Sequence, residues 1–203
     1  MKILIAVPTY ENIQAATFKS IYDLDKCGHW VLFDFVQGYD VASARNHIAN
    51  KAKAEGTDYV LMVDNDVIIP HDALRNLLEE PKDVCMGFYG HRWDNVFDGR
   101  TNVCRLGEYN YTDLYRVEEF RRMREQGIIR EQIHGGGLGC ALIKTDVFDR
   151  IAYPYFSWTH YQDGNMLSED LNFCERCKEN NIPIFVDPRV GCDHLFRTYK
   201  GVM

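Results

Sequence analysis

The chain has 203 residues, of which 46% are hydrophobic and 26% are charged. This length fits one compact domain with a full core, and this composition excludes an intrinsically disordered chain. A formal net charge of -7 argues against nucleic acid or an anionic membrane as the main partner. No stretch approaches the roughly 20 apolar residues that cross a bilayer, so we expect no transmembrane segment. The seven cysteines lack the spacing of a disulfide framework, which fits a reducing compartment and predicts a cytoplasmic protein.

Strands and helices alternate along the first part of the chain. In chain order, the pattern predicts a strand at 2–7, a helix at 12–24, a strand at 30–36, a helix at 41–56, a strand at 59–63, a helix at 70–80 and a strand at 83–89. The strands are almost continuously apolar, which is typical of strands buried on both faces. We therefore predict an α/β fold with a mostly parallel central sheet and helices on both faces.

The alternation breaks between 91 and 133, where the chain is polar and rich in tyrosine. We interpret this segment as a variable elaboration of one domain that spans 1–203, not as a second domain. The remaining elements expected are a helix at 113–126, a glycine loop at 135–139, a strand at 140–144, a short helix beginning at Thr145 or Asp146, a helix at 169–180 and a strand at 182–187.

Two aspartates interrupt the apolar run YVLMVDNDVIIP at 59–70. Val63 ends a buried strand, so Asp64 begins the loop at the carboxyl end of that strand, where ligands bind in open α/β sheets. Residues two apart in an extended chain point the same way, so Asp64 and Asp66 are aimed at one point. Two hard oxygen donors suit Mg²⁺ or Mn²⁺, with phosphate oxygens in the other positions. The alternative is a solvated loop or a helix cap.

Two later segments carry acid–base groups. In SEDLNF (168–173), Glu169 and Asp170 lie in the first turn of a helix. One of these carboxylates acts as a general base toward an alcohol, or both only stabilise the helix. In VDPRVGCDHL (186–195), His194 lies just beyond the last strand. This imidazole either completes a Mn²⁺ shell begun by the two aspartates or is a hydrogen-bonded surface histidine.

Six segments in a fixed order carry a family resemblance. VPTYEN follows the first strand and ASARNHIANKA precedes the third; DYVLMVDNDVIIP, GGGLGCALIK, SEDLNF and GCDHL come after them. This order resembles that of family-2-like glycosyltransferases with the GT-A fold, over roughly 1–195 and most weakly over 91–133. The resemblance implies a single-domain GT-A fold. It also implies transfer of one sugar from a nucleoside-diphosphate donor, UDP in the first instance, to a hydroxyl of a carbohydrate or other acceptor.

Carried over residue by residue, the resemblance assigns a metal site and a base. Asp64, Asp66 and His194 would bind a divalent metal, Mn²⁺ or Mg²⁺, that bridges the two donor phosphates. Asp170 would be the catalytic base that takes the proton of the acceptor hydroxyl, with Glu169 supporting it. A one-step displacement of this kind would invert the anomeric carbon.

The same resemblance assigns a donor pocket. Arg45 would approach the diphosphate or the donor sugar, and the glycine loop at 135–139 would leave room for the sugar or the acceptor. The residues assigned to the nucleotide-sugar are Thr9, Tyr10 and Glu11 at the nucleotide end, together with Arg45, Asn65 and Gly137.

The sequence departs from many relatives after the second strand, where those proteins carry a paired acidic motif that binds the nucleobase of the donor. Here that region reads VLFDFVQGYD (31–40); Asp34 lies inside the strand, so Gln37 or Asp40 is the expected substitute. Arg197 and Lys200 either close over an anionic ligand or solvate the end of the chain. Aromatic side chains that either pack two loops or form a stacking platform are Trp93, Trp158, Tyr109, Tyr111, Tyr115, Tyr153, Tyr155 and Tyr161.

Three other interpretations stay open. A nucleotidyltransferase also uses paired aspartates and a metal, but the segment after the first strand is not the basic, glycine-rich loop expected there. A catalytically inactive GT-A module would only bind a partner, and the intact acids speak against it. A zinc site would use Cys174, Cys177 and Cys192 with His194, but small cysteines on a buried helix face are common.

Overall fold

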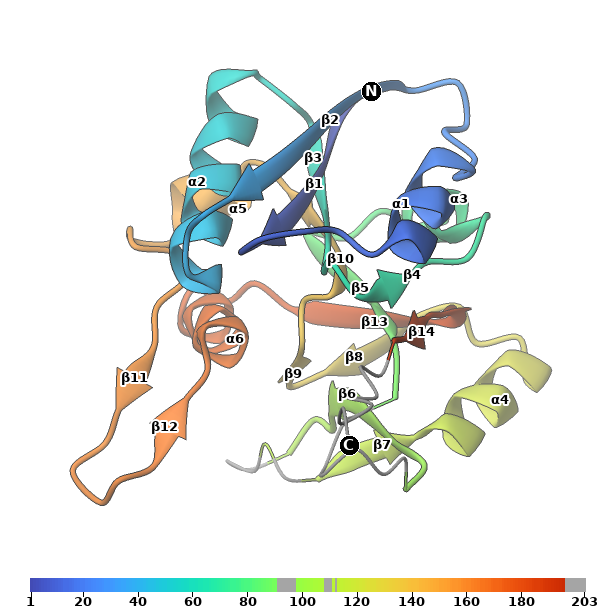
Figure 1. The fold of residues 1–203 in the computed structure, drawn as a ribbon. Helices are drawn as coiled ribbons and strands as arrows, with labels where there is room; N and C mark the ends of the chain where they lie inside the picture. Colours follow the sequence, from blue (N-terminus) through green and yellow to red (C-terminus); the bar gives the residue numbers. More distant parts are fainter. Residues whose placement is uncertain (91–97, 108–110, 112, 196–203) are drawn as a thin grey trace, which may run out of the picture.

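The computed structural model describes residues 1–90, 98–107, 111 and 113–195. Its central sheet has the strand order β2-β1-β3-β10-β5-β13-β8 (Figure 1). The strands of this sheet are Lys2–Thr9 (β1), Trp30–Gln37 (β2), Tyr59–Val63 (β3), Val84–Phe88 (β5), Glu131–Ile133 (β8), Cys140–Lys144 (β10) and Ile184–Gly191 (β13).

The sheet is mixed but mostly parallel, as predicted. Strand β1 is parallel to β2 and β3, and β5 is parallel to β13. Strand β10 runs antiparallel between β3 and β5, and β8 runs antiparallel to β13. The carboxyl ends of β1, β3 and β5 therefore meet at one edge of the sheet, which is where a ligand site is expected.

Helices cover both faces of the sheet, which confirms the second part of the prediction (Figure 1). Successive residues of β1 alternate between two cores: Leu4 packs in the core that includes α2, α4, α5 and α6, and Ile5 in the core that includes α1 and α3. The helices are Ala15–Tyr22 (α1), Val41–Ala54 (α2), Ala73–Glu79 (α3), Val117–Glu125 (α4), Val147–Arg150 (α5) and Glu169–Glu179 (α6).

The other strands in the described residues form three small sheets. Strand β4 (Val67–Ile68) pairs with β14 (Asp193–His194), and β11 (Thr159–His160) pairs with β12 (Met166–Leu167). A three-stranded sheet consists of β6 (Arg100–Cys104), β7 (Leu114–Arg116) and β9 (Gly135–Gly136).

Several predicted boundaries differ from the structure, and three of the differences have a clear physical reason. The helix expected at 113–126 begins only at Val117, because the residues before it pair with β6 as β7. The expected glycine loop begins as strand β9, because Gly136 lies so close to β6 that a Cβ atom would approach the Asn102 carbonyl oxygen to 2.7 Å. The last strand continues beyond 187 to Gly191, where an irregular register lets it pair again with Phe88.

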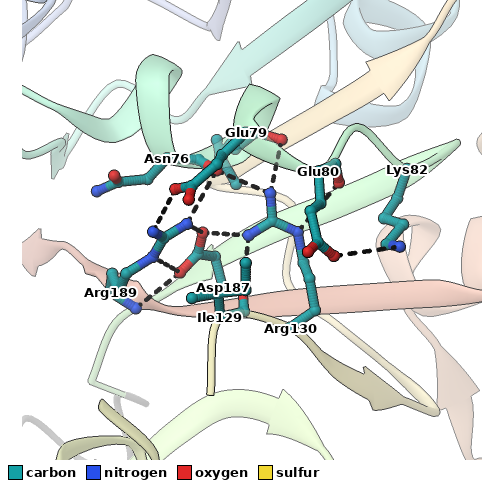
Figure 2. A network of polar contacts seen from close by, with 9 residues as sticks. Asn76, Glu79, Glu80, Lys82, Ile129, Arg130, Asp187 and Arg189 are labelled. Carbon is teal, nitrogen blue, oxygen red and sulfur yellow. Dashed lines mark hydrogen bonds and ion pairs between the residues drawn. The ribbon is translucent and has the colours of Figure 1, made fainter. Parts of the chain in front are cut away.

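A buried ion-pair network fastens α3 to the sheet (Figure 2). The Asp187 carboxylate on β13 is fully buried and accepts from the guanidinium groups of Arg130 and Arg189. Arg130 also donates to the carbonyl oxygens of Asn76 and Leu77 in α3, at 2.7 and 3.1 Å. The Asp187 carboxylate thus positions Arg130 and Arg189, and both guanidinium groups donate to carbonyl oxygens of α3.

All seven cysteines lie within the described residues and are free thiols. Within the described ranges, we find no helix that combines the length and the apolar character needed to cross a bilayer.

Candidate active site

Residues 64–66, the DND turn, follow β3 directly and are held by backbone hydrogen bonds. The Asp64 amide donates to the Gly139 carbonyl at 3.0 Å, and the Val67 amide donates to the Asp64 carbonyl at 3.1 Å. Asn65 faces the loop after β1, where its amide donates to Thr9 Oγ1 at 3.3 Å and to the Asn12 carbonyl at 2.9 Å. The turn is therefore tied both to the glycine loop and to the end of the first strand.

A buried arginine joins two of the predicted site segments. The Arg45 side chain on α2 is only 2% exposed, and its Nη2 lies 2.7 Å from Asp64 Oδ1. Its Nη1 pairs with Glu169 Oε1 at the start of α6. Burial alone would lower the pKa of Arg45, but Asp64 and Glu169 outweigh burial and raise the pKa above its usual value. Arg45 is therefore a permanent cation that holds the two acidic segments together.

A cavity of about 350 Å³ opens at the carboxyl ends of β1 and β3. It gathers most of the predicted site residues from four separate stretches of the chain. Its lining is Pro8, Thr9, Tyr10, Tyr39, Asp40, Val41, Arg45, Asp64, Asn65, Asp66, Glu169 and Asp170. Glu11 is absent from the described residues that line this cavity; it is exposed, and its carbonyl oxygen accepts from Gln37 Nε2.

Asp170 also lines a second cavity, of about 310 Å³. Asp170 Oδ1 accepts from Ser168 Oγ and from the Leu171 amide at 2.8 Å, which fixes the carboxylate at the wall shared by both cavities. Gly137 and His194 also line the second cavity. A carboxylate that lines two cavities is well placed to act on a group in one cavity while a second molecule fills the other.

The adjacent helix positions of Glu169 and Asp170 have different surroundings. Glu169 is buried against Arg45, and burial raises its pKa despite that cation. Asp170 faces the cavities and is partly exposed. The two carboxylates thus differ in environment, since Glu169 contacts a buried cation and Asp170 lines the cavities.

His194 reaches the DND turn through the pairing of β14 with β4. This pairing sets His194 opposite Val67, and the Leu195 amide donates to the Asp66 carbonyl at 2.8 Å. His194 Nε2 lies 3.6 Å from Asp66 Oδ1. In the part of the chain that the structure describes, no three His, Cys, Asp or Glu side chains are grouped tightly enough to hold a metal ion. The structure thus brings Asp66 and His194 together, while Asp64 lies against Arg45.

Tyr89 is a site residue that the sequence analysis missed. Its hydroxyl accepts the Gly139 amide at 3.1 Å, and its ring meets the His194 ring edge-on at 5.1 Å. Burial raises the pKa of Tyr89 well above its usual value, and the nearby Asp64 and Asp170 raise it further. The phenol therefore stays protonated. Its position after β5, at the same sheet edge as Asp64, was the available signal.

The expected substitutes for base recognition have other partners. Gln37 contacts the backbone of Glu11, as described above. Asp40 caps α2 through the amides of Ala42 and Ser43, at 3.1 and 3.2 Å, and lines the first cavity. Asp34, inside β2, pairs with Lys51 at 2.8 Å.

The zinc arrangement is not formed. Cys174 and Cys177 are buried in one core, whereas Cys192 lies in the core on the other face of the sheet. Of the aromatic residues weighed as a platform, Tyr115 and Tyr155 are buried in packing and Tyr111 lines the second cavity. Four residues singled out above lie outside the described residues: Trp93, Tyr109, Arg197 and Lys200.

Solved structures share this architecture at low sequence identity. The crystal structure of A197 from STIV is 17% identical, with 97% of this chain and 86% of that chain covered and a TM-score of 0.62. GalNAc-T7, solved with UDP, GalNAc and Mn²⁺, is 11% identical over 96% of this chain and 44% of that one, with a TM-score of 0.62. TarS 1-349 of S. aureus is 14% identical over 96% and 60%, with a TM-score of 0.53. These likenesses concern the fold.

The sheet, its two helical layers and these likenesses define a GT-A fold of the α/β class. The chain belongs to glycosyl transferase family 2, whose sequence profile matches residues 16–152. A search of curated protein sequences gives no match.

Proposed function

We propose that the chain transfers one sugar from a nucleoside-diphosphate donor, with UDP as the expected nucleotide, to an acceptor hydroxyl. The observation that carries this proposal is that Asp170 lines two cavities. One cavity is lined by the DND turn and the end of β1, and the other by Gly137, Tyr89 and His194. We assign the first cavity to the nucleotide and diphosphate, and the second to the acceptor.

Asp64, Asp66 and His194 are the proposed ligands of Mn²⁺ or Mg²⁺. Carboxylate oxygens with one imidazole are a donor set that suits Mn²⁺, and Asp66 and His194 already lie 3.6 Å apart. Asp64 uses Oδ1 for Arg45, which leaves Oδ2 for another contact. A divalent metal in this position would neutralise charge on the departing diphosphate.

The protein's own groups supply the remaining chemistry. Asp170 takes the proton of the acceptor hydroxyl while the acceptor oxygen bonds to the anomeric carbon and the nucleoside diphosphate leaves. This one-step displacement inverts the anomeric carbon. Arg45 and Glu169 hold the helix that carries Asp170 against the DND turn. Tyr89, a neutral hydrogen-bonding group, lies close to both Asp64 and Asp170.

Replacement of the proposed base tests this function. In Asp170→Asn the side chain keeps its shape but cannot accept the proton, so we expect the rate of UDP release from UDP-sugars to fall by about 10²- to 10⁴-fold. Binding of UDP, measured by calorimetry, should not change. UDP release at the wild-type rate in Asp170→Asn would show that this carboxylate is not the base.

Two wider expectations belong to the same proposal. We propose that residues 1–203 act as one GT-A domain, with the 91–133 segment as its elaboration. The cytoplasm is the proposed location, and the seven free thiols support it, because such thiols suit a reducing compartment.

A further inference from the structure

Strand β2 is one end of the central sheet. Figure 1 shows it at the outer edge, and no strand in the described ranges pairs with its other side. Its pairing with β1 runs without a bulge from Trp30 to Gln37. The Trp30 amide donates to the Met1 carbonyl at 3.1 Å, and bonding residues alternate along a parallel strand. The amides of Phe33 and Phe35 therefore point away from the sheet.

An exposed aromatic cluster lies beside this free edge. It consists of Phe33 and Phe35 on β2 with Phe18 and Tyr22 on α1. The Phe33 and Phe35 rings meet at 4.4 Å, and the Phe18 ring lies 6.5 and 6.3 Å from them. Their exposed fractions are 44% for Phe18, 72% for Tyr22, 40% for Phe33 and 39% for Phe35. Four clustered rings that remain this exposed are unusual for a surface without a binding partner.

The edge carries none of the features that normally prevent strands from pairing. Such features are proline, a bulge, or a charge that points along the edge. Strand β2 has no proline, and its register is regular. Its one charged side chain, Asp34, is neutralised by Lys51 of α2 at 2.8 Å, on the face opposite the aromatic cluster.

We propose that β2 and this aromatic cluster form a twofold interface with a second copy of the chain. Antiparallel pairing of the two β2 strands would extend the sheet across the dimer and place both aromatic clusters on the same face. The four rings expose roughly 400 Å², taking about 200 Å² for a whole aromatic side chain. This is about half of the roughly 800 Å² that a stable interface buries on each partner. The free edge of β2 adds to it.

Charge favours a second copy over a membrane. Lys19, an exposed lysine beside the cluster, pairs with Asp23 one helical turn away, and Lys26 donates to the Tyr22 carbonyl oxygen at 3.2 Å. The whole chain has a formal net charge of -7, which repels an anionic lipid surface. Rings that pack against identical rings need no charged partner.

Sedimentation velocity of the full chain, from about 1 to about 100 µM, tests the proposal. We expect the wild type to approach twice its 23.6 kDa mass. The double variant Phe33→Lys/Phe35→Lys should raise the dissociation constant at least tenfold. Tyr22→Lys alters the aromatic cluster on α1 and leaves β2 unchanged. It should also weaken dimerisation, so it tests the proposal even if the strand variant fails to fold. The matched control is Tyr153→Lys/Tyr161→Lys, which replaces two exposed tyrosines away from β2 and should still dimerise.

Hydrogen exchange identifies the paired edge. In the dimer, the Phe33 and Phe35 amides should exchange more slowly as protein concentration rises. A wild type that stays at 23.6 kDa at the highest concentration would overturn the proposal, as would variants that dimerise like the wild type. A monomer that binds phosphatidylglycerol–phosphatidylcholine vesicles through the same rings would also overturn it and assign the surface to a membrane.

Discussion

Tyr89 and the glycine loop share one small space at the centre of the site. A Cβ atom at Gly139 would lie 2.8 Å from both Asp64 Oδ2 and the Tyr89 hydroxyl oxygen. At Gly137 it would lie 2.5 Å from the same hydroxyl and 3.4 Å from Asp170 Oδ2. The loop is therefore glycine at these positions because carboxylates and a phenol occupy the space of a side chain.

We predict that Gly139→Ala displaces Asp64 or Tyr89 and lowers transferase activity by about 10²-fold, since such losses follow a shift of about 1 Å. The measurement is UDP release from a UDP-sugar, with circular dichroism to confirm the fold. Gly107→Ala is the control, because a Cβ atom there meets nothing within 4 Å. Equal activity of the two variants would show that the close approach at Gly139 does not matter.

The placement of candidate residues was predictable from sequence where it follows from a position in the chain. Asp64 and Asp66 come directly after a buried strand, and Glu169 and Asp170 lie in the first turn of a helix, whereas the choice of Asp170 as the base came from the family resemblance and stays a prediction. The roles of Arg45 and Tyr89 depend on contacts with residues far away in the chain. No local pattern shows that a helical arginine will be buried between Asp64 and Glu169.

At the scale of elements, the ion pairs of Asp187 connect β13 and α3 (Figure 2). Arg130 and Arg189 both depend on this carboxylate, and the Arg130 side chain is itself buried. Removal of one partner from a buried ion pair leaves an uncompensated charge, which costs about 3 kcal/mol or more.

Asp187→Asn should therefore lower the free energy of unfolding by about 3 kcal/mol, as measured by urea titration. Asp23→Asn is the control, because the Lys19–Asp23 pair is exposed and contributes far less. A loss in Asp187→Asn no larger than that of the control would mean that the network does not stabilise the attachment of α3.

Long apolar strands were predictable from the sequence, whereas the direction of a strand and the presence of very short strands were not. Apolar runs at 2–7 and 59–63 predicted β1 and β3 within two residues. The antiparallel course of β10 is set by long-range pairing on both sides, which a hydrophobic run does not encode. The strands β7 and β9 are short, and they exist only because β6 lies beside them.

At the scale of the whole molecule, buried thiols should lower the free energy of unfolding as the pH becomes alkaline. Burial raises the pKa of Cys85 from 9.0 to about 12, so the native thiol stays protonated while the unfolded one ionises above pH 9. A group whose pKa is raised in the folded state stabilises it below the unfolded pKa, and that stability is lost as pH rises.

Between pH 7 and pH 10, Cys85 should account for a loss of about 1.4 kcal/mol in the free energy of unfolding. Urea titrations at both pH values, on the wild type and on Cys85→Ala, measure it. Cys85→Ala will be less stable at neutral pH, but its further loss on going to pH 10 should be smaller by that amount. An identical loss in both proteins would show that Cys85 titrates normally in the folded state.

The DND turn and His194 are proposed to form a metal-dependent nucleotide site. This site is tested by calorimetric titration of UDP, with Mn²⁺ and then with EDTA, on the wild type, on Asp66→Ala and on Asp163→Ala, a control aspartate outside the site. We predict binding that needs Mn²⁺, that weakens at least tenfold in Asp66→Ala, and that Asp163→Ala leaves unchanged. UDP binding that ignores both EDTA and Asp66→Ala would contradict the metal site, and no binding in either condition would contradict UDP as the donor nucleotide.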